Sequence, residues 1–289
     1  METLIANTYG AGKVCLITGG NGQIGFECAN ALARTGYHVI IASHPPGVSQ
    51  KAAESIRNLT GNVNVEGLDM NLMNLASIRK FVADFQAKRL PLHLLINNGA
   101  IMNTPFSRDA RGTEAQFATN YLGHFYLTNL LLNNLRGSTP SRIVNVASSV
   151  HYAAHTITFD SITSKSAYSG LGNYAMSKFA IMLFTHELAL RLRSSGVVVN
   201  AVHPGVIATS LYRHTKWAKM VLSTPLTWLM PEPIEGASRI LKAALDPQYE
   251  DISGRYMAEG RIWTPSPFVK SDNSTRLYQI SVDLTGLMI

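Results

Sequence analysis

The sequence lacks the features of a disulfide-rich secreted domain or of a protein that spans a membrane. Only Cys15 and Cys28 are cysteines among its 289 residues, which is too few for a disulfide framework and fits a reducing compartment. No run of about 18 uncharged apolar residues occurs, and residues 1–10 have neither the basic start nor the apolar core of a signal peptide. We therefore expect a cytoplasmic protein, and leave open a peripheral location on an intracellular membrane or lipid droplet.

The sequence also lacks clustered charge. The net charge is +7, but lysine and arginine are dispersed, without the run of about five or six that a nucleic-acid-binding arm would show. An ordinary basic enzyme surface is the favoured interpretation, and we expect no nucleic-acid partner. An anionic cofactor or an anionic membrane surface is compatible with this charge. No metal site is predicted.

Short apolar segments alternate with amphipathic ones along most of the chain. Hydrophobic residues make up 46% of the sequence, enough to bury one large core. The apolar segments, read as strands, are residues 13–18, 37–42, 63–68, 92–96, 142–147, 197–202 and 254–257. The helical patterns are residues 26–35, 52–59, 75–88, 117–135, 172–193 and 235–245. Strands and helices that alternate at this interval require right-handed crossovers and a parallel sheet.

This pattern predicts an α/β fold with a Rossmann-type, doubly wound parallel sheet in a single domain. We expect an N-terminal extension over residues 1–12, the Rossmann domain over residues 13–260 and a C-terminal tail over residues 261–289. The segment from the fifth strand to Gly172 is polar and irregular, and it reads as a long loop over a site.

A glycine-rich turn joins the first expected strand to the first expected helix. Residues 19–25 read Gly-Gly-Asn-Gly-Gln-Ile-Gly. Glycines let the backbone approach a pyrophosphate, and a helix N-terminus offers unpaired N–H groups and a positive dipole. Against the spacing Thr-Gly-x-x-x-Gly-x-Gly, Thr18, Gly19 and Gly25 are in phase, but Gln23 replaces the middle glycine. A tight turn without a ligand is the alternative, and the strand and helix on either side favour a nucleotide.

The end of the second expected strand bears on the choice of nucleotide. An acidic residue there would bind the adenosine ribose of NAD, but Ser43 and His44 occupy this position. With no carboxylate to repel a 2′-phosphate, NADP is preferred over NAD, although His44 is a weaker anchor than arginine. A loop start without a cofactor role is the alternative for His44. Asp69 closes the third strand at the end where ligands of such sheets gather.

Tyr174 and Lys178 lie four residues apart in an expected helix and therefore share one of its faces. A phenol titrates near about 10, and a neighbouring ammonium favours the phenolate, which makes the tyrosine a usable proton donor or acceptor. The spacing alone is a weak signal, because surface or packing roles explain most such pairs. The nucleotide-binding pattern upstream strengthens it. Further polar candidates are Asn120, within an expected helix, and Ser148, after the fifth strand.

The order of these motifs resembles that of the short-chain dehydrogenase/reductase family from about residue 13 to residue 257. The matching motifs are Thr18 to Gly25, Asp69, Asn97-Asn98, Ser148 with Tyr174 and Lys178, and Pro204-Gly205 leading to Thr209. Segments 78–82, 91–98, 120–125 and 203–205 are similar to the retinol-dehydrogenase-like branch. Two departures are Gln23 and the order Asn97-Asn98-Gly99-Ala100, where the family has Asn-Asn-Ala-Gly.

The resemblance implies a role for each candidate residue. Tyr174 would be the acid/base, and Lys178 would lower its pKa and bind the nicotinamide ribose. Ser148 would bind the substrate oxygen, with Ser149 as the alternative, and Asn120 would hold a water in the proton relay. The implied cofactor-binding residues are Gly19, Asn21, Gln23, Ile24, Gly25, His44, Asp69, Asn97, Tyr174, Lys178, Ile207 through its backbone, and Thr209.

The resemblance further implies an oxidoreductase that uses NADP, or else NAD, to interconvert a lipophilic alcohol and its aldehyde or ketone. The expected substrate is polyprenol-like, dolichal-like or retinoid-like, and the apolar segment Trp217 to Pro231 suits a flap, a membrane-facing patch or a lid. The alternatives are a steroid or xenobiotic carbonyl reductase and a non-catalytic NADP-binding scaffold. A homodimer through the apolar faces of residues 117–135 and 172–193 is open, since burial in the core explains them nearly as well.

Overall fold

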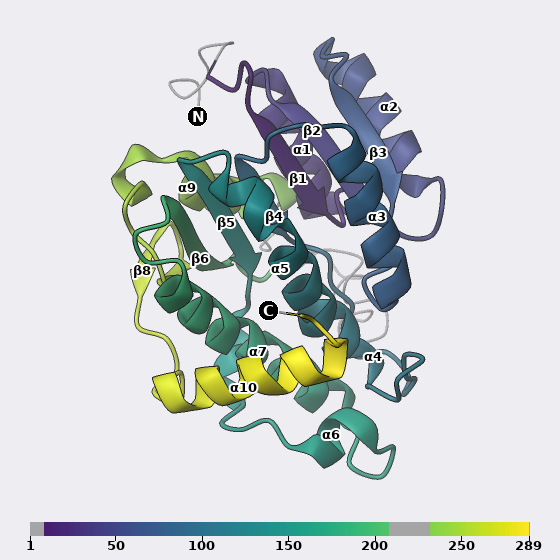
Figure 1. The fold of residues 1–289 in the computed structure, drawn as a ribbon, viewed down its shortest axis with the longest axis vertical. Coiled ribbons are helices and arrows are strands. Elements are labelled where there is room, and N and C mark those ends of the chain that lie inside the picture. The colour runs from purple at the N-terminus through teal and green to yellow at the C-terminus, as the bar shows by residue number, and fades with distance from the viewer. Residues whose placement is uncertain (1–8, 208–231, 289) are drawn as a thin grey trace, which may run out of the picture.

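A mostly parallel sheet runs through the centre of the structure, a computed structural model that describes residues 9–207 and 232–288 (Figure 1). Within these residues the strand order is β3-β2-β1-β4-β5-β6-β7-β8, and β7 with β8 is the antiparallel pair. The strands are β1 Val14–Thr18, β2 His38–Ser43, β3 Val65–Asp69, β4 Leu94–Asn97, β5 Ser141–Val146, β6 Val197–His203, β7 Tyr256–Ala258 and β8 Arg261–Trp263. The expected strands are therefore present, within a few residues of their predicted bounds.

Helices cover both faces of this sheet (Figure 1). One face carries α1 Gln23–Arg34, α2 Val48–Thr60 and α9 Pro233–Leu245. The other carries α3 Leu75–Ala87, α5 Gly123–Arg136 and α7 Gly170–Arg191, with α10 Ser271–Thr285 packed on α7. Side chains of a strand point alternately to the two faces, so Leu16 of β1 packs in one apolar layer while Cys15 and Ile17 pack in the other.

The sheet reverses its order beside β1, because β2 and β3 extend from one side of it and β4 onwards from the other. In open α/β sheets ligands bind at the carboxyl ends of the strands at this switch point. Here those ends are Thr18 of β1 and Asn97 of β4. The glycine-rich turn and the segment Asn98 to Ala100 therefore meet at this switch point, which we call the crevice.

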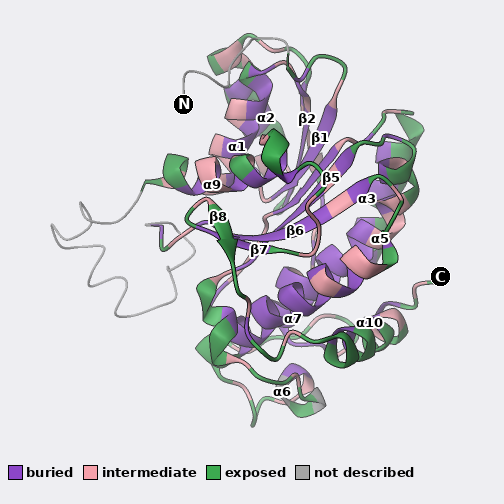
Figure 2. Ribbon diagram, turned by 90° about the vertical axis from the view of Figure 1, so that its left-hand side faces the viewer, coloured by how far each residue is buried: buried purple, intermediate pink, exposed green. Residues whose placement is uncertain are grey.

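The predicted C-terminal tail contains regular structure. Residues 261–263 form β8, which extends the sheet, and residues 271–285 form α10, which lies alongside α7 (Figure 2). The prediction of a C-terminal tail named no strand or helix in these residues and so missed both elements. It failed because β8 is short and because α10 buries hydroxyl side chains, which do not form an apolar stripe in the sequence.

Two further stretches differ from the sequence-based reading. The expected loop before Gly172 contains a 3₁₀ turn, η3 Ser149–Ala153, and a short helix, α6 Phe159–Thr163. The expected helix 117–135 is α4 Ala115–Phe117, a π-helical turn η2 Ala118–Leu122, and α5 in continuous succession. The segment Trp217 to Pro231 and Thr209 lie outside the described residues. Within the described chain, no helix has the length and apolar character needed to cross a bilayer.

Candidate active site

The glycine-rich turn after β1 is closed so tightly that two of its positions admit only glycine. Gly19 has φ +65°, and a Cβ there would lie 2.8 Å from the Cα of Gly99. A Cβ on Gly25 would lie 2.4 Å from the carbonyl oxygen of Gly19. No side chain caps the N-terminus of α1, where Gly22 is the N-cap, and no acidic residue lies in its first turn. An anion can therefore approach the first-turn N–H groups of α1.

Both departures from the family pattern are accommodated by this geometry. Gln23 is the first residue of α1 and its side chain is exposed, so it does not fill the turn. After β4, the N–H groups of Asn98 and Gly99 each donate to Thr18 Oγ1 at 2.9 Å. A Cβ on Gly99 would lie 2.9 Å from Leu72 Cδ1. Gly99 therefore stands at a close approach of the segments that follow β1, β3 and β4.

The other described residues that we predict to bind the cofactor differ in how far they are buried. His44 and Asn21 are exposed, Ile24 is half-buried and Ile207 is buried. Asp69 Oδ1 accepts a hydrogen bond from the Gly47 N–H at 3.0 Å, so this carboxylate orders the turn before α2.

Asn97 points into the protein rather than toward the glycine-rich turn. Its Nδ2 donates to Thr128 Oγ1 at 2.9 Å and to Asn145 Oδ1 at 2.8 Å. Asn145 Nδ2 in turn donates to Thr185 Oγ1 at 2.9 Å. The neighbouring Asn98 is the amide that faces the turn, since its Nδ2 donates to the Thr18 carbonyl at 3.0 Å. A cofactor role for the Asn97 side chain stays a prediction.

Tyr174 and Lys178 share one face of α7, as the sequence predicts, and both are almost fully buried. Lys178 Nζ lies 5.8 Å from the centroid of the Tyr174 ring and donates to the Val146 carbonyl at 2.7 Å. Burial lowers the pKa of Lys178 to about 7, because the ammonium loses its hydration. Val146 ends β5, so this hydrogen bond joins α7 to the strand end that leads to Ser148.

Ser148 is half-buried and caps the 3₁₀ turn η3, where its Oγ accepts from the Val150 N–H at 3.4 Å. Its carbonyl accepts from His151 Nδ1 at 2.7 Å, and His151 Nε2 accepts from the Ser266 N–H at 3.2 Å. Sequence reasoning assigned no role to His151, which fixes the backbone of Ser148 against the C-terminal segment. The only hint of this role in the sequence is that His151 follows Ser148 by three residues. Ser149, the alternative to Ser148, is exposed.

Asn120 is fully buried in the π-helical turn η2, in which the Gly123 N–H donates to the Ala118 carbonyl five residues earlier. The Asn120 side chain holds the backbone of Ile101 in both directions, accepting from its N–H at 2.8 Å and donating to its carbonyl at 2.9 Å. Its Nδ2 also donates to Ser177 Oγ at 3.0 Å. Asn120 therefore links the loop after β4 to α7.

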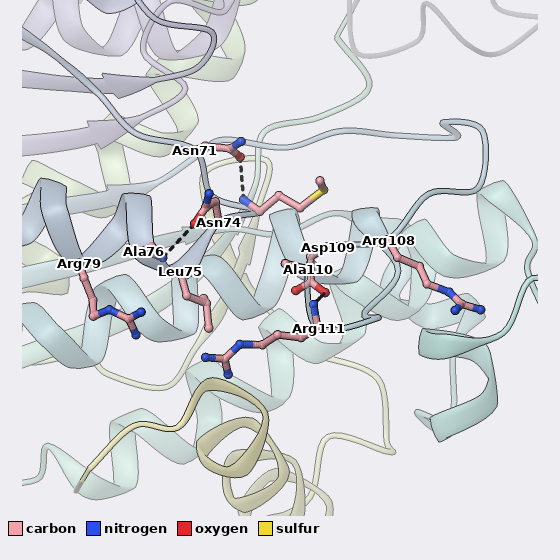
Figure 3. Close-up of a pocket in the computed structure, with 10 residues that line it drawn as sticks. Asn71, Asn74, Leu75, Ala76, Arg79, Arg108, Asp109, Ala110 and Arg111 are labelled. Carbon is pink, nitrogen blue, oxygen red and sulfur yellow. Dashed lines mark hydrogen bonds between the residues drawn. The ribbon is translucent and has the colours of Figure 1, made fainter.

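A surface pocket of about 300 Å³ lies elsewhere, at the start of α3 (Figure 3). None of the predicted catalytic or cofactor-binding residues lines it. Arg111 extends toward the side of Arg79, and Arg108 points away (Figure 3). Arg111 donates to the Leu284 carbonyl near the end of α10, and Arg79 donates to Tyr126 Oη at 3.0 Å. Arg79 and Arg111 therefore hold neighbouring elements together. Because no predicted catalytic residue lines this pocket, we place the chemistry at the crevice.

Comparison with known proteins identifies the family. A family model described as short chain dehydrogenase matches residues 13–219. This chain is a short-chain dehydrogenase. Human polyprenol dehydrogenase is 41% identical to it over 285 residues, which cover 96% of this chain and 86% of that protein. Human retinol dehydrogenase 13 is 39% identical over 283 residues, which cover 96% and 85%.

A solved structure agrees with the family. The crystal structure of an uncharacterized protein from Mycobacterium paratuberculosis has a TM-score of 0.77 and 30% identity to this short-chain dehydrogenase, covering 96% of this chain and 95% of that one. The predicted family, fold class and oxidoreductase activity on CH–OH groups are confirmed. A nicotinamide cofactor follows from the family. The relatives named for lipophilic alcohols agree with the predicted class of function.

The residues of the crevice fit such a cofactor. The N-terminus of α1 lacks a side-chain cap. Ser43 Oγ, at the end of β2, is buried without a hydrogen-bond partner among the described residues. Lys178 has three N–H donors, of which the Val146 carbonyl takes one. Polar groups are therefore present for the pyrophosphate, the adenosine side and the nicotinamide ribose.

Proposed function

We propose that this short-chain dehydrogenase uses NADP to interconvert a long lipophilic alcohol, of polyprenol or retinoid type, and its carbonyl form. The observation that carries the chemistry is the buried pair on α7, with Lys178 Nζ 5.8 Å from the Tyr174 ring. The substrate class is supported by relatives named polyprenol dehydrogenase and retinol dehydrogenase at 41% and 39% identity.

A nicotinamide held in this site would supply or accept the hydride. In the proposed reaction the Tyr174 phenol gives a proton to the substrate oxygen during reduction and takes it back during oxidation. The Lys178 ammonium stabilises the phenolate form, and the Ser148 hydroxyl donates a hydrogen bond to the same oxygen. Asn120, whose two side-chain N–H groups are both donated within the protein, would hold a water of the proton relay through an oxygen. Catalysis then depends on orientation and on a tuned tyrosine.

The preference for NADP is also part of this proposal. Asp69, the carboxylate that ends β3, already accepts the Gly47 N–H at 3.0 Å. No side chain caps the N-terminus of α2, which begins at Val48, and no acidic residue lies in its first turn. A 2′-phosphate at the end of β2 would face the exposed His44 and the N-terminus of α2, whose dipole has a favourable sign and which it would share with the Asp69 carboxylate. His44 and Thr209 are proposed to complete the cofactor site.

The test is turnover of NADPH with a long isoprenoid aldehyde, retinal and a steroid ketone by the wild type and by Tyr174→Phe. We expect the isoprenoid aldehyde or retinal to be reduced, and Tyr174→Phe to lower kcat by about 10²- to 10⁴-fold because the proton donor is lost. NADPH binding, followed by fluorescence, should persist in the variant. Tyr249→Phe, a buried tyrosine that donates to the Gly260 carbonyl, is the matched control and should keep its activity.

The competing functions give different results in the same assay. A steroid or xenobiotic carbonyl reductase would favour the steroid ketone over both long substrates. A non-catalytic scaffold would bind NADPH and turn over none of the three substrates. Undiminished activity in Tyr174→Phe would refute the assignment of the acid/base. Cytoplasmic localisation, peripheral membrane contact and a homodimer stay predictions.

A further inference from the structure

His124 joins two parts of the catalytic crevice that are distant in sequence. It lies in the first turn of α5, directly after the π-helical turn η2, and only 3% of its surface is exposed. Its Nε2 is 2.8 Å from Thr18 Oγ1, at the end of β1, and its Nδ1 is 2.8 Å from the Asn120 carbonyl oxygen.

The hydrogen atoms in these two contacts can be assigned from their partners. A carbonyl oxygen only accepts, so the proton lies on His124 Nδ1 and is donated to Asn120. Thr18 Oγ1 already accepts the N–H groups of Asn98 and Gly99, so its own hydrogen is free to be donated to His124 Nε2. The imidazole is therefore neutral and in one tautomer. Burial lowers the pKa of His124 to about 4, which agrees with the neutral form.

The contacts continue from Asn120 to the catalytic helix. Asn120 Nδ2 donates to Ser177 Oγ at 3.0 Å, and Ser177 Oγ donates to the Tyr174 carbonyl at 2.7 Å. All three intermediate side chains, those of His124, Asn120 and Ser177, are buried. An unbroken series of contacts thus runs from the nucleotide turn to the backbone of Tyr174. Buried networks in which every member has its partners fix geometry strongly.

We propose that His124 is a positioning residue that holds the π-helical turn and the catalytic helix in register with the nucleotide turn. It contacts neither the reacting atoms nor the cofactor in this role, and acts through Thr18 and Asn120. The proposal rests on the proposed function, because it assumes that Tyr174 is the acid/base. Its consequence is that the angle and distance between bound nicotinamide and the Tyr174 hydroxyl depend on an imidazole outside the predicted catalytic set.

Three variants test this role in the full chain. His124→Phe keeps a ring of similar shape without hydrogen bonds, Thr18→Val removes the hydroxyl, and Thr18→Ser keeps it. We expect His124→Phe and Thr18→Val each to lower kcat and kcat/KM together by about 10- to 100-fold, because misplacement of reacting groups is costly. KM should change little, and Thr18→Ser should restore most of the kcat lost in Thr18→Val. The double variant should lose no more than the more damaged single variant, because both break one path.

A retained kcat in His124→Phe with only a lower melting temperature would overturn the proposal, as would losses that multiply in the double variant. If His124→Phe does not fold, Ser177→Ala tests the same path from its other end, because it removes the contacts of Ser177 Oγ with Asn120 Nδ2 and with the Tyr174 carbonyl; an unchanged kcat in that variant would also overturn the proposal. Nitrogen-15 NMR of histidine in the wild type gives a readout independent of activity. A neutral ring with its proton on Nδ1 at pH 7 is expected, and a charged ring or the other tautomer contradicts the path. A wild type inactive on all substrates would instead refute the proposed function.

Discussion

Lys178 shows how the role proposed for a residue in catalysis conflicts with stability. Its ammonium is buried, with a hydrogen bond to the Val146 carbonyl, and burial lowers its pKa to about 7. The pKa of a lysine in the unfolded chain is about 10.4. Between these values the unfolded chain binds more protons than the folded one. The free energy of unfolding therefore rises with pH in this window, by at most about 1.4 kcal/mol per pH unit.

We predict that Lys178→Met removes this pH dependence together with the activity. From pH 7 to pH 10 the free energy of unfolding of the wild type should rise relative to that of Lys178→Met, as measured by urea denaturation at each pH. Lys80→Met is the control, because Lys80 is exposed and paired with Asp84, and its curve should run parallel to that of the wild type. Parallel curves for Lys178→Met and the wild type would show that Lys178 keeps an ordinary pKa.

Sequence reasoning predicted correctly which residues lie together when their motif is local, and it missed contacts between residues of distant segments. Tyr174 and Lys178 are four residues apart, so helical periodicity alone places them on one face. His124 acquires its role from Thr18, which is 106 residues away, and His151 acquires part of its role from Ser266, which is 115 residues away. The periodicity of a sequence does not reveal contacts between residues so far apart.

At the scale of elements, α10 is a long helix that the sequence did not indicate. Its buried face includes Ser274, Ser281 and Thr285, which resemble a solvent-facing pattern. The hydroxyls of Ser281 and Thr285 donate to the carbonyls four residues earlier, at 2.8 Å and 2.7 Å, so they can be buried without loss of hydrogen bonds. Ser281 also contacts Tyr121 Oη at 2.6 Å, next to Asn120 in η2.

Tyr278 supplies the main aromatic contact of α10. Its ring lies 5.0 Å from that of Phe125 and 3.8 Å from the Arg191 guanidinium carbon, and its hydroxyl donates to Asn129 Oδ1 at 2.5 Å. These contacts reach both α5 and α7. The helix therefore covers the layer that carries the proposed catalytic pair, Tyr174 and Lys178 (Figure 2).

We predict that Tyr278→Ala lowers the free energy of unfolding by about 3–5 kcal/mol, the range for truncating a large buried aromatic side chain. Ile280→Ala is the matched control on the same helix, since Ile280 is 37% exposed, and its effect should stay within about 0.5 kcal/mol. Chemical denaturation measures both. Equal small effects would mean that α10 contributes little to stability. Full activity of folded Tyr278→Ala would show that α10 acts on stability alone.

At the scale of the whole molecule, the central sheet was predictable because each strand and helix follows a local period and parallel crossovers have one hand. The packing of α10 and the antiparallel strand β8 could not be predicted from the sequence. Both features depend on contacts between the end of the chain and elements far upstream. One such contact is the hydrogen bond from the Ser266 N–H to His151 Nε2. The glycine-rich turn and the loop after β4 were identified separately, and the sheet order brings them together.

The reactivity of the two cysteines reports on whether the folded core is closed. Cys15 lies on β1 and Cys28 on α1, and both are fully buried in the same apolar layer. Burial raises the pKa of both thiols well above the usual range. Thiolates are the reactive form, so neither residue can react with an alkylating or disulfide reagent while β1 and α1 stay packed. Reaction then requires that this layer open.

We predict that the native protein gives no fast reaction with a chromogenic disulfide reagent at pH 8, and that two thiols react at once in denaturant. Cys28→Ala leaves a single thiol and should show the same slow rate as Cys15→Ala, because opening of one common layer exposes both residues. Added NADPH should slow the reaction further, since a ligand that binds only the folded state lowers the population of the open one. One thiol reacting quickly in the native protein would show instead that β1 and α1 open separately, and the glycine-rich turn between them would then be a point of local opening.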